Sequence, residues 1–177
     1  MQINTVRNLA VAFMFMKGIS TASNIMIGNG YGARDKKHIL ESAKACALLV
    51  LVTECVFVAA FIIFPKELLS IYSTDTELLV FAVPLMLIAA GFQISDGFQN
   101  LALNMLRGIK DVRMPALIAF VSYWVVMIPM SIWLALPSGM NLGVSGVWWG
   151  FVIGLSLASI ILLLRFIKQY KTIETRW

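Results

Sequence analysis

The residues best suited to chemistry in this chain form a polar stripe around Asp96. An acid, three amides and a base follow one another at steps of three or four residues: Gln93, Asp96, Asn100, Asn104 and Arg107. At roughly 100° per residue they fall within an arc of roughly 80° on one helix face. The surrounding stretch, from about residue 78 to 105, is apolar and long enough to cross a bilayer. Because an ionisable residue at membrane depth is costly and usually faces a bundle interior or a water-filled cavity, the stripe predicts a pathway or binding site for ions or polar solutes.

Asp96 is the first candidate for ion binding. A carboxylate in a cavity within the membrane could bind and release a proton. It could equally bind Na⁺, with the side-chain oxygens of Gln93 and Asn100 as further ligands. The alternative is a packing role, in which polar side chains hydrogen-bond neighbouring helices and hold the bundle together. Asn100 suits that role as well as ion binding, because asparagine side chains commonly join helices in membranes.

Lys17 is the second candidate, because it lies near the centre of the first apolar stretch. Its face continues with polar residues at helical spacing: Ser20, Thr21 and Asn24. A lysine at that depth requires a partner or water, and Asp96 is the obvious carboxylate. A Lys17–Asp96 pair that breaks when a cation binds would be a coupling device. The alternatives are a lysine that faces a hydrated cavity without a role in coupling, or one that snorkels towards the interface.

Glu54 is a third and weaker candidate. It lies in the middle of the second apolar stretch, beside Thr53. Its other neighbours on the helix are apolar: Val50, Leu51, Phe57 and Val58. The sequence around Glu54 therefore does not form a polar face of its own.

The composition is that of a membrane protein. Of the 177 residues 60% are hydrophobic, and the mean hydropathy is +0.86, whereas soluble domains contain roughly 45–50% apolar residues. The net charge of +5 comes from basic residues between apolar stretches, which fits the orientation rule for membrane proteins better than nucleic-acid binding. Cys46 and Cys55 lie in one apolar stretch, and we expect both to be buried free thiols.

Five apolar stretches are each long enough to span roughly 30 Å of hydrocarbon. They cover about residues 3–28, 43–64, 78–105, 115–136 and 144–167. Short turn-like connections join them, and no linker divides the chain. The sequence therefore predicts an all-α membrane protein of five transmembrane helices.

The charges of the connections predict an orientation. Basic residues gather in the first connection, the third connection and the tail: Arg34, Lys36, Lys37, Arg107, Lys110, Arg113, Arg165, Lys168, Lys171 and Arg176. The second connection sets Lys66 against Glu67, Asp75 and Glu77, and the fourth has no charge. By the positive-inside rule, the first and third connections and the C-terminus are cytoplasmic and the N-terminus is outside. We expect a multi-pass protein of the inner (plasma) membrane.

Glycines and a proline mark the last two stretches. Gly146, Gly150 and Gly154 form a ridge of small residues at spacing four, which predicts a close approach of two helix backbones. Pro129 lies inside the fourth stretch and predicts a kink there.

No pattern in the sequence predicts an enzyme, a resident metal or a cofactor. His38 is the only histidine, and it lies in a basic connection. The sequence contains no HExxH or GxSxG motif, no metal-spaced Cys and His cluster, and no nucleotide-binding glycine motif. We therefore expect no enzymatic activity, no cofactor and no nucleic-acid partner.

Five segments resemble the multidrug and toxic compound extrusion (MATE) transporter family in their order and spacing. They are GISTASNIMIGNGYGARDKK at 18–37, FPKELLSIYSTDTELL at 64–79, FQISDGFQNLALNMLRGIKDVRMP at 92–115, SYWVVMIPMSIWLAL at 122–136 and LGVSGVWWGFVIG at 142–154. The first is similar to the family's small-residue helix that ends in a glycine turn and a basic loop. The second and third resemble the outer connection before the tenth helix, that helix and the loop after it. The last two resemble helices eleven and twelve.

The resemblance implies a twelve-helix antiporter with two six-helix lobes and a central cavity. Such proteins export cationic, lipophilic compounds in exchange for H⁺ or Na⁺. The family's cation-binding aspartate on the tenth helix falls on Asp96. The family can place a tyrosine four residues earlier, where this chain has Phe92 and so lacks one possible oxygen ligand. Lys17 is not part of the family pattern, and the glutamate of the seventh helix has no counterpart.

The resembling segments correspond to helices eight to twelve of the family, most of one lobe. We therefore expect the chain to be the C-terminal part of a larger transporter in the lipid bilayer, with the N-terminal lobe supplied in cis or in trans. Two other functions stay open. One is a flippase of lipid-linked or polysaccharide precursors, which would have more basic residues in its cavity and which Lys17 slightly favours. The other is a non-transporting membrane scaffold, which has no need of the Asp96 stripe.

Overall fold

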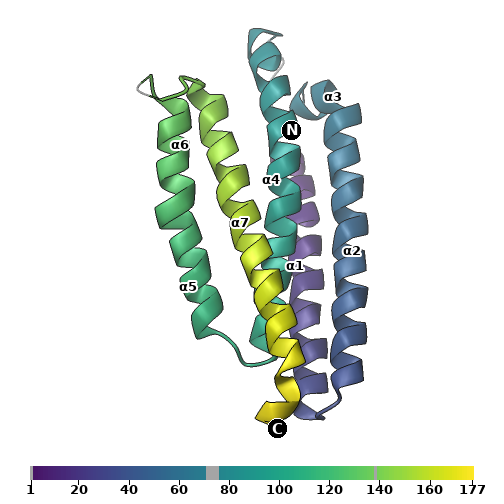
Figure 1. Cartoon of the computed structure of the whole chain (residues 1–177). Coiled ribbons are helices and arrows are strands. Elements are labelled where there is room, and N and C mark those ends of the chain that lie inside the picture. Colours follow the sequence, from purple (N-terminus) through teal and green to yellow (C-terminus); the bar gives the residue numbers. More distant parts are fainter. Residues whose placement is uncertain (1, 71–75, 138) are drawn as a thin grey trace.

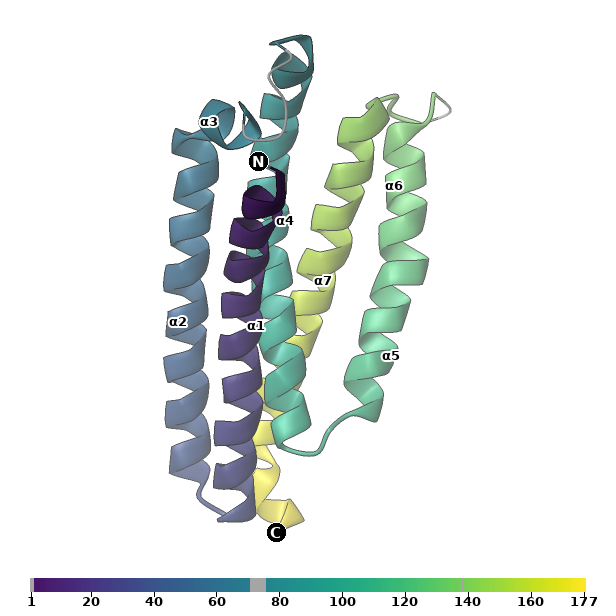
Figure 2. The same cartoon turned by 180° about the vertical axis from the view of Figure 1, so that it is seen from behind.

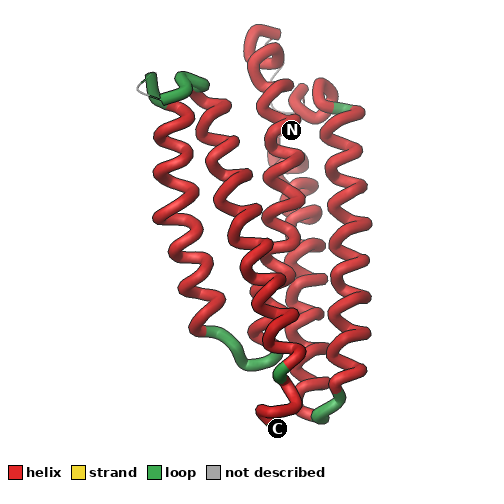
Figure 3. Tube along the Cα trace, viewed as in Figure 1, coloured by secondary structure: helices red, strands yellow, loops and turns green. Residues whose placement is uncertain are grey.

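The computed structural model describes residues 2–70, 76–137 and 139–177. All regular secondary structure within these residues is helical (Figures 1 and 3). The elements are α1 (Gln2–Gly32), α2 (Lys36–Ile63), α3 (Pro65–Ser70), α4 (Thr76–Gly108), α5 (Arg113–Val121), the π-helix η1 (Ser122–Met127), α6 (Ile128–Ala135), α7 (Gly143–Lys171) and the 3₁₀-helix η2 (Ile173–Arg176).

The predicted all-α fold with five long helices is confirmed. α5, η1 and α6 follow one another without a break and form one long helix, which joins α1, α2, α4 and α7. The helices extend beyond the apolar stretches because their polar ends are also helical, and the second connection contains the short helix α3 instead of a simple turn. Three helices of the described residues are long and apolar enough to cross a membrane: Lys36–Ile63, Arg113–Ala135 and Gly143–Lys171. Asp75 of the second connection and Ser138 of the fourth lie outside the described residues.

The long helices run up and down in alternation. Figures 1 and 2 show the C-terminus, the α1–α2 connection and the α4–α5 connection at one end of the bundle, which we call the basic end. The N-terminus, α3 and the α6–α7 connection lie at the other end. The basic end collects the cationic residues of the connections and tail: Arg34, Lys36, Lys37, Lys110, Arg113, Lys168 and Lys171.

α4 is the central helix, because it packs against α1, α2 and α7. α7 in turn contacts η1 and α6, so the α5–α6 helix lies on the far side of α7 (Figure 1). The largest buried apolar side chains come from the halves of the helices near the basic end: Ile27, Ile39, Leu101, Leu106, Ile109, Leu162 and Ile173. Burial of these side chains holds α1, α2, α4 and α7 together at that end.

Two ion pairs and an aromatic contact close the basic end. Asp111, after α4, accepts a 2.6 Å hydrogen bond from Nε of Arg165 on α7. Lys36 lies 3.2 Å from the carboxylate of Glu174, and Trp177 packs on Tyr31 with ring centroids 6.4 Å apart. These contacts tie the C-terminal tail to α1 and α2.

The predicted glycine ridge is confirmed on the face of α7 that meets α6. A β-carbon at Gly150 would lie 2.5 Å from Cα and 2.6 Å from the backbone nitrogen of Ser131. Gly146 and Gly154 make equally close approaches to the α6–η1 backbone, at Leu134 and Met127. Only glycine leaves room for this approach of the two backbones.

Pro129 is accommodated by the π-helical turn that precedes it. The N–H of Ile128 donates to the carbonyl of Tyr123, five residues back rather than four. Because Pro129 has no N–H and its ring crowds the carbonyl of the preceding turn, the helix widens locally there. The predicted kink site is thus a π-turn.

Much of the outer surface is apolar, as contact with lipid requires. Exposed large side chains cover the outer faces of the helices, among them Leu48, Val52, Val56, Phe120, Val125 and Leu164. Cys46 is buried, but Cys55 is exposed, so the expectation that both thiols are buried is wrong for Cys55. Nine residues, about two and a half helical turns, separate Cys46 from Cys55, so the two side chains lie on opposite sides of α2.

Candidate functional site

A polar pocket lies between α1, α2 and α4. The space it encloses is small, about 10 Å³, which is room for about one water molecule. Eight residues line it: Met16, Lys17 and Ser20 from α1, Glu54 from α2, and Gln93, Asp96, Gly97 and Asn100 from α4. The pocket therefore brings the three sequence candidates Asp96, Lys17 and Glu54 into one site.

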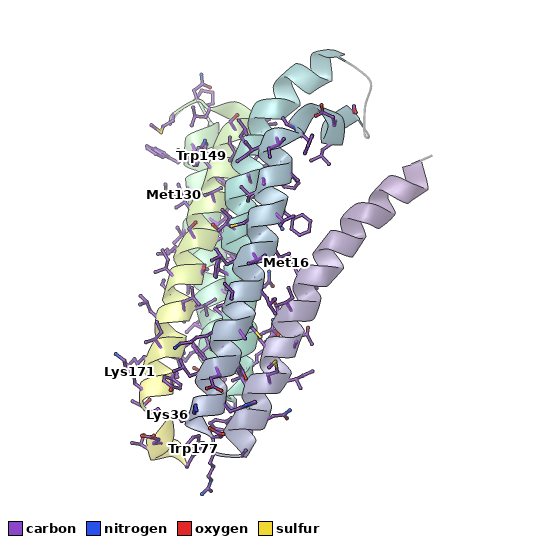
Figure 4. The ribbon with its side chains drawn as sticks, turned by 90° about the vertical axis from the view of Figure 1, so that its right-hand side faces the viewer. Met16, Lys36, Met130, Trp149, Lys171 and Trp177 are labelled. Carbon is purple, nitrogen blue, oxygen red and sulfur yellow. The ribbon has the colours of Figure 1, made fainter. Side chains whose placement is uncertain are left out.

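The pocket lies deep within the helices. Lys17 is at the middle of α1. Asp96 lies twelve residues before Gly108, the last residue of α4, which is about 18 Å along the helix axis. That depth places the charged groups well inside roughly 30 Å of hydrocarbon. Figure 4 shows α1 close to α2 at the basic end and leaning away from it towards its N-terminus.

Asp96 is half-buried and interacts electrostatically with Lys17 across the pocket. The side-chain amide of Asn100 donates a 3.0 Å hydrogen bond to the backbone carbonyl of Asp96. The amide of Asn104 donates in the same way to the carbonyl of Asn100, at 2.9 Å. The amide nitrogens of these two residues thus donate to carbonyls one turn earlier on their own helix.

Glu54 is the most deeply buried ionisable side chain among the described residues, with 1% of its surface exposed. Neither of its carboxylate oxygens has a hydrogen-bond partner in the described part of the chain. Its carboxyl group packs against the backbone of α4 at Gly97, where an added β-carbon would lie 2.8 Å from Cδ of Glu54. The hydroxyl of Ser20, also buried, is another polar group without a partner in that part.

The remaining predicted site residues lie elsewhere. Asn24, Asn104 and Phe92 are not among the residues that line the pocket. Phe92 packs edge-on against Trp148 of α7, with ring centroids 5.9 Å apart and an interplanar angle of 88°. Asn24 lies nearer the basic end, where its backbone oxygen approaches Gly108.

A second polar cluster, which the sequence analysis missed, lies on another face of α4. Gln99 is buried and its amide nitrogen donates to the hydroxyl of Tyr123 in the π-turn. One turn away, the hydroxyls of Ser95 and Ser156 are 2.7 Å apart and join α4 to α7. The spacing of four between Ser95 and Gln99 was the available signal, because it places both on one face of an apolar helix.

The lining of the pocket has a chemistry suited to a small cation. It offers two carboxylates, an amide oxygen from each of Gln93 and Asn100, and a serine hydroxyl, and it holds one lysine that competes for the same acids. These are ligands for a proton or a hard monovalent ion. Among the described residues no group of three or more His, Cys, Asp or Glu side chains could hold a metal ion.

Comparison with known proteins identifies the family. The MatE family profile matches residues 5–133. The chain is 36% identical over 171 residues to a probable multidrug resistance protein NorM of Rhizobium meliloti, which covers 93% of this chain and 36% of that protein. It is 33% identical over 160 residues to the multidrug resistance protein MdtK of Edwardsiella ictaluri, covering 88% and 35%. The chain thus spans about a third of the length of these curated relatives.

A solved structure shares the fold. A multidrug resistance MATE family transporter of the MOP superfamily, in an inward-facing conformation, superimposes with a TM-score of 0.82 at 17% identity, covering 97% of this chain and 39% of that one. The order of the five long helices is therefore that of part of a MATE transporter. Because the family profile covers most of the sequence and this fold agrees with it, the chain belongs to the MATE (MatE) family.

Proposed function

We propose that the chain is part of a secondary active transporter that exports cationic, lipophilic compounds in exchange for H⁺ or Na⁺. The observation that carries the proposal is the pocket, which holds two acids and a lysine inside an otherwise apolar bundle. Membership of the MATE family and the names of the relatives, which are multidrug resistance proteins, support the same function.

In this proposal Asp96 binds the coupling cation, and Gln93 and Asn100 supply further oxygens. The charge of Lys17 competes with the cation for Asp96. When the cation arrives the interaction with Lys17 weakens, and when the cation leaves it is restored. The site with a bound cation and the empty site therefore favour different positions of α1 relative to α4. A transporter with two conformations requires such a difference in contacts between its loaded and empty states.

The chain acts with a second helical lobe, on the same polypeptide or on a partner. Secondary transporters of this kind move one repeat against another around a central site, and the chain spans 36% of the length of its NorM relative. We further propose that the protein resides in the inner (plasma) membrane with the basic end and the C-terminus in the cytoplasm. The gathering of cationic residues at that end supports this orientation.

The test is Asp96→Asn in the protein as the cell expresses it, with Glu41→Gln as the matched control. Glu41 is an exposed acid near the basic end of α2, paired with Lys37 at 3.7 Å. The readout is accumulation of a fluorescent lipophilic cation, with membrane levels of each variant measured by blotting. We expect Asp96→Asn to accumulate as much dye as cells without the gene, and Glu41→Gln to behave as wild type. Wild-type export by Asp96→Asn would reject Asp96 as the coupling residue and favour a scaffold.

Lys17 favours a second candidate function, a flippase of lipid-linked or polysaccharide precursors. A cation that lines the pocket would attract the phosphate of such a headgroup. Under this alternative Lys17→Gln abolishes transfer of a fluorescent phosphate-linked lipid across reconstituted vesicles, whereas Asp96→Asn leaves it intact. The opposite pattern supports cation-coupled efflux.

A further inference from the structure

Glu54 is the buried ionisable group that the proposed role of Asp96 leaves unused. It is 1% exposed, it lines the same pocket, and neither of its oxygens is hydrogen-bonded within the described residues. The amide of Gln93 is nearby, but no hydrogen bond of ordinary geometry joins the two side chains. An ionised carboxylate without a partner in such a place is strongly disfavoured, so it is neutralised or paired instead.

The charges around Glu54 show what would neutralise it. The ionisable groups that line the pocket with it are Asp96 on α4 and Lys17 on α1. Glu54 and Asp96 repel each other, and Lys17 attracts Asp96. Two carboxylates and one ammonium leave one negative charge, which one monovalent cation balances. Two acids that share a site do not both ionise easily.

We infer that Glu54 is a second ion-coupling residue, and that the ion taken up is a proton which Glu54 holds and shares with Asp96. A role of Glu54 in transport rests on the proposed antiport function. Within that function, the coupling ion would be a proton and Glu54 would be a second residue that binds it. The step is a simple protonation: one Glu54 carboxylate oxygen gains H⁺ from the outer side, and the same O–H bond breaks when the proton leaves towards the cytoplasm.

Packing around Glu54 favours a proton over Na⁺. A sodium ion needs several oxygens around it to replace its hydration shell. Gln93, Asn100 and Ser20 also line the pocket, but the carboxyl group of Glu54 lies against the backbone of α4 at Gly97, and both of its oxygens are buried without a hydrogen-bond partner among the described residues. The positive charge of Lys17 in the same pocket opposes a metal cation further. A proton needs only one of the two oxygens and no ligand shell.

The inference is tested without transport, by chemical labelling of the protein in lipid nanodiscs. Dicyclohexylcarbodiimide, an apolar reagent, reacts with protonated carboxyl groups in apolar surroundings, and peptide mass spectrometry locates the product. We expect Glu54 to be labelled at neutral pH at least about tenfold more than exposed Glu41, because an exposed carboxyl is almost entirely ionised there. We expect the label on Glu54 to decline as pH rises.

Two variants predict the direction in which carbodiimide labelling changes. Asp96→Asn removes the neighbouring negative charge, so Glu54 should lose its proton more readily and its labelling at a given pH should fall. Lys17→Gln removes a positive charge that stabilises the Asp96 carboxylate, so labelling of Asp96 should rise. Glu41→Gln should leave both unchanged. Circular dichroism checks that each variant folds.

Three results would overturn the inference. The first is labelling of Glu54 no greater than that of Glu41, together with the absence of a protonated-carboxyl carbonyl band from the infrared difference spectrum of wild type minus Glu54→Gln. If Glu54→Gln does not fold, Glu54→Asp replaces it in the difference spectrum. The second is protection of Glu54 by NaCl, compared with choline chloride at constant pH, which would assign the site to Na⁺. The third is labelling that does not respond to Asp96→Asn. If dye export needs Asp96 but Glu54 is not protonated, the proposed function stands and this inference fails. If Glu54 is protonated but Asp96→Asn exports normally, the reverse holds.

Discussion

At the scale of single residues, the neighbourhood of Lys17 and Asp96 links the structure most directly to the proposed transport function. Both line one pocket, and an electrostatic interaction joins them. A lysine inside a membrane protein is retained only where it faces water or an acid. In the proposed mechanism Lys17 is a resident cation that the coupling ion must displace, so its charge and not its bulk should matter.

Lys17→Gln should reduce export of a lipophilic cation by at least about tenfold, equivalent to about 1.4 kcal/mol. The reason is that the empty site loses the charge that balances Asp96 before the next cation arrives. Dye accumulation in cells measures the effect, and Lys44→Gln, which removes an exposed lysine from α2, is the control. Coupled export that is intact in Lys17→Gln would discard the ion-pair device.

Gly97→Ala should lower the free energy of unfolding by about 1–3 kcal/mol, the range for overpacking a tight site. The new methyl group would meet the Glu54 carboxyl group. In the double variant Gly97→Ala with Glu54→Ala, the loss should be smaller than the sum of the two single losses, because residues in contact couple. Denaturant unfolding in detergent micelles measures this. Gly18→Ala is the control, since nothing lies within 4 Å of a β-carbon there; additive losses would place Glu54 away from Gly97.

The sequence indicated part of this site. The spacing of Gln93, Asp96 and Asn100 on one helix face predicted which residues of α4 would point together, and the three do line the pocket. Glu54 was the weakest candidate because its neighbours along α2 are apolar. Its polar surroundings come from α1 and α4, and which faces of three helices meet is a matter of tertiary packing that periodicity within one helix does not contain.

At the scale of helices, hydropathy predicted the long elements well because a bilayer imposes both their length and their apolar surface. The polar helix ends were less predictable. α2 begins at Lys36, where the side chain of Asp35 accepts a 2.9 Å hydrogen bond from the N–H of His38 and so caps the helix before its apolar residues begin. The π-turn before Pro129 shows a similar limit: proline predicts a disturbed helix, but the local geometry depends on how α7 packs against it.

Gly150→Val should destabilise the protein by about 1–3 kcal/mol, because its side chain would collide with the backbone of α6 at Ser131 as well as with the Ser131 hydroxyl. Thermal unfolding of the protein in nanodiscs measures the loss. Gly32→Ala is a suitable comparison, since its β-carbon would meet nothing within 4 Å. Equal unfolding temperatures for Gly150→Val and wild type would show that α6 and α7 do not approach at this glycine.

At the scale of the whole molecule, the basic end is tightly packed and the pocket lies above it. The buried apolar side chains of α1, α2, α4 and α7 concentrate near the cytoplasmic end that we propose, and the tail closes that end through Asp111–Arg165 and Lys36–Glu174. α1 leans away from α2 towards its N-terminus (Figure 4).

Cysteine labelling tests the orientation of the molecule. In a background where Cys46 and Cys55 are replaced by alanine, Met140→Cys in the α6–α7 connection should react with a membrane-impermeant maleimide added to intact cells. Lys37→Cys at the basic end should react only after the membrane is permeabilised. Both positions are exposed in the structure, so burial does not protect them. Reaction of Lys37→Cys in intact cells, with Met140→Cys protected, would invert the proposed topology.

The most direct test of the central claim, that Asp96 couples cation movement to export, measures both movements together in inside-out membrane vesicles. A pH gradient is imposed and followed with a fluorescent dye, a lipophilic cation is added, and the gradient's decay is recorded, with an imposed Na⁺ gradient as the parallel experiment. We expect the substrate to accelerate decay of one of the two gradients in wild type and in Glu41→Gln, and to have no effect in Asp96→Asn at equal membrane levels. Substrate-driven decay in Asp96→Asn at the wild-type rate, or none in wild type with either ion, would contradict the account.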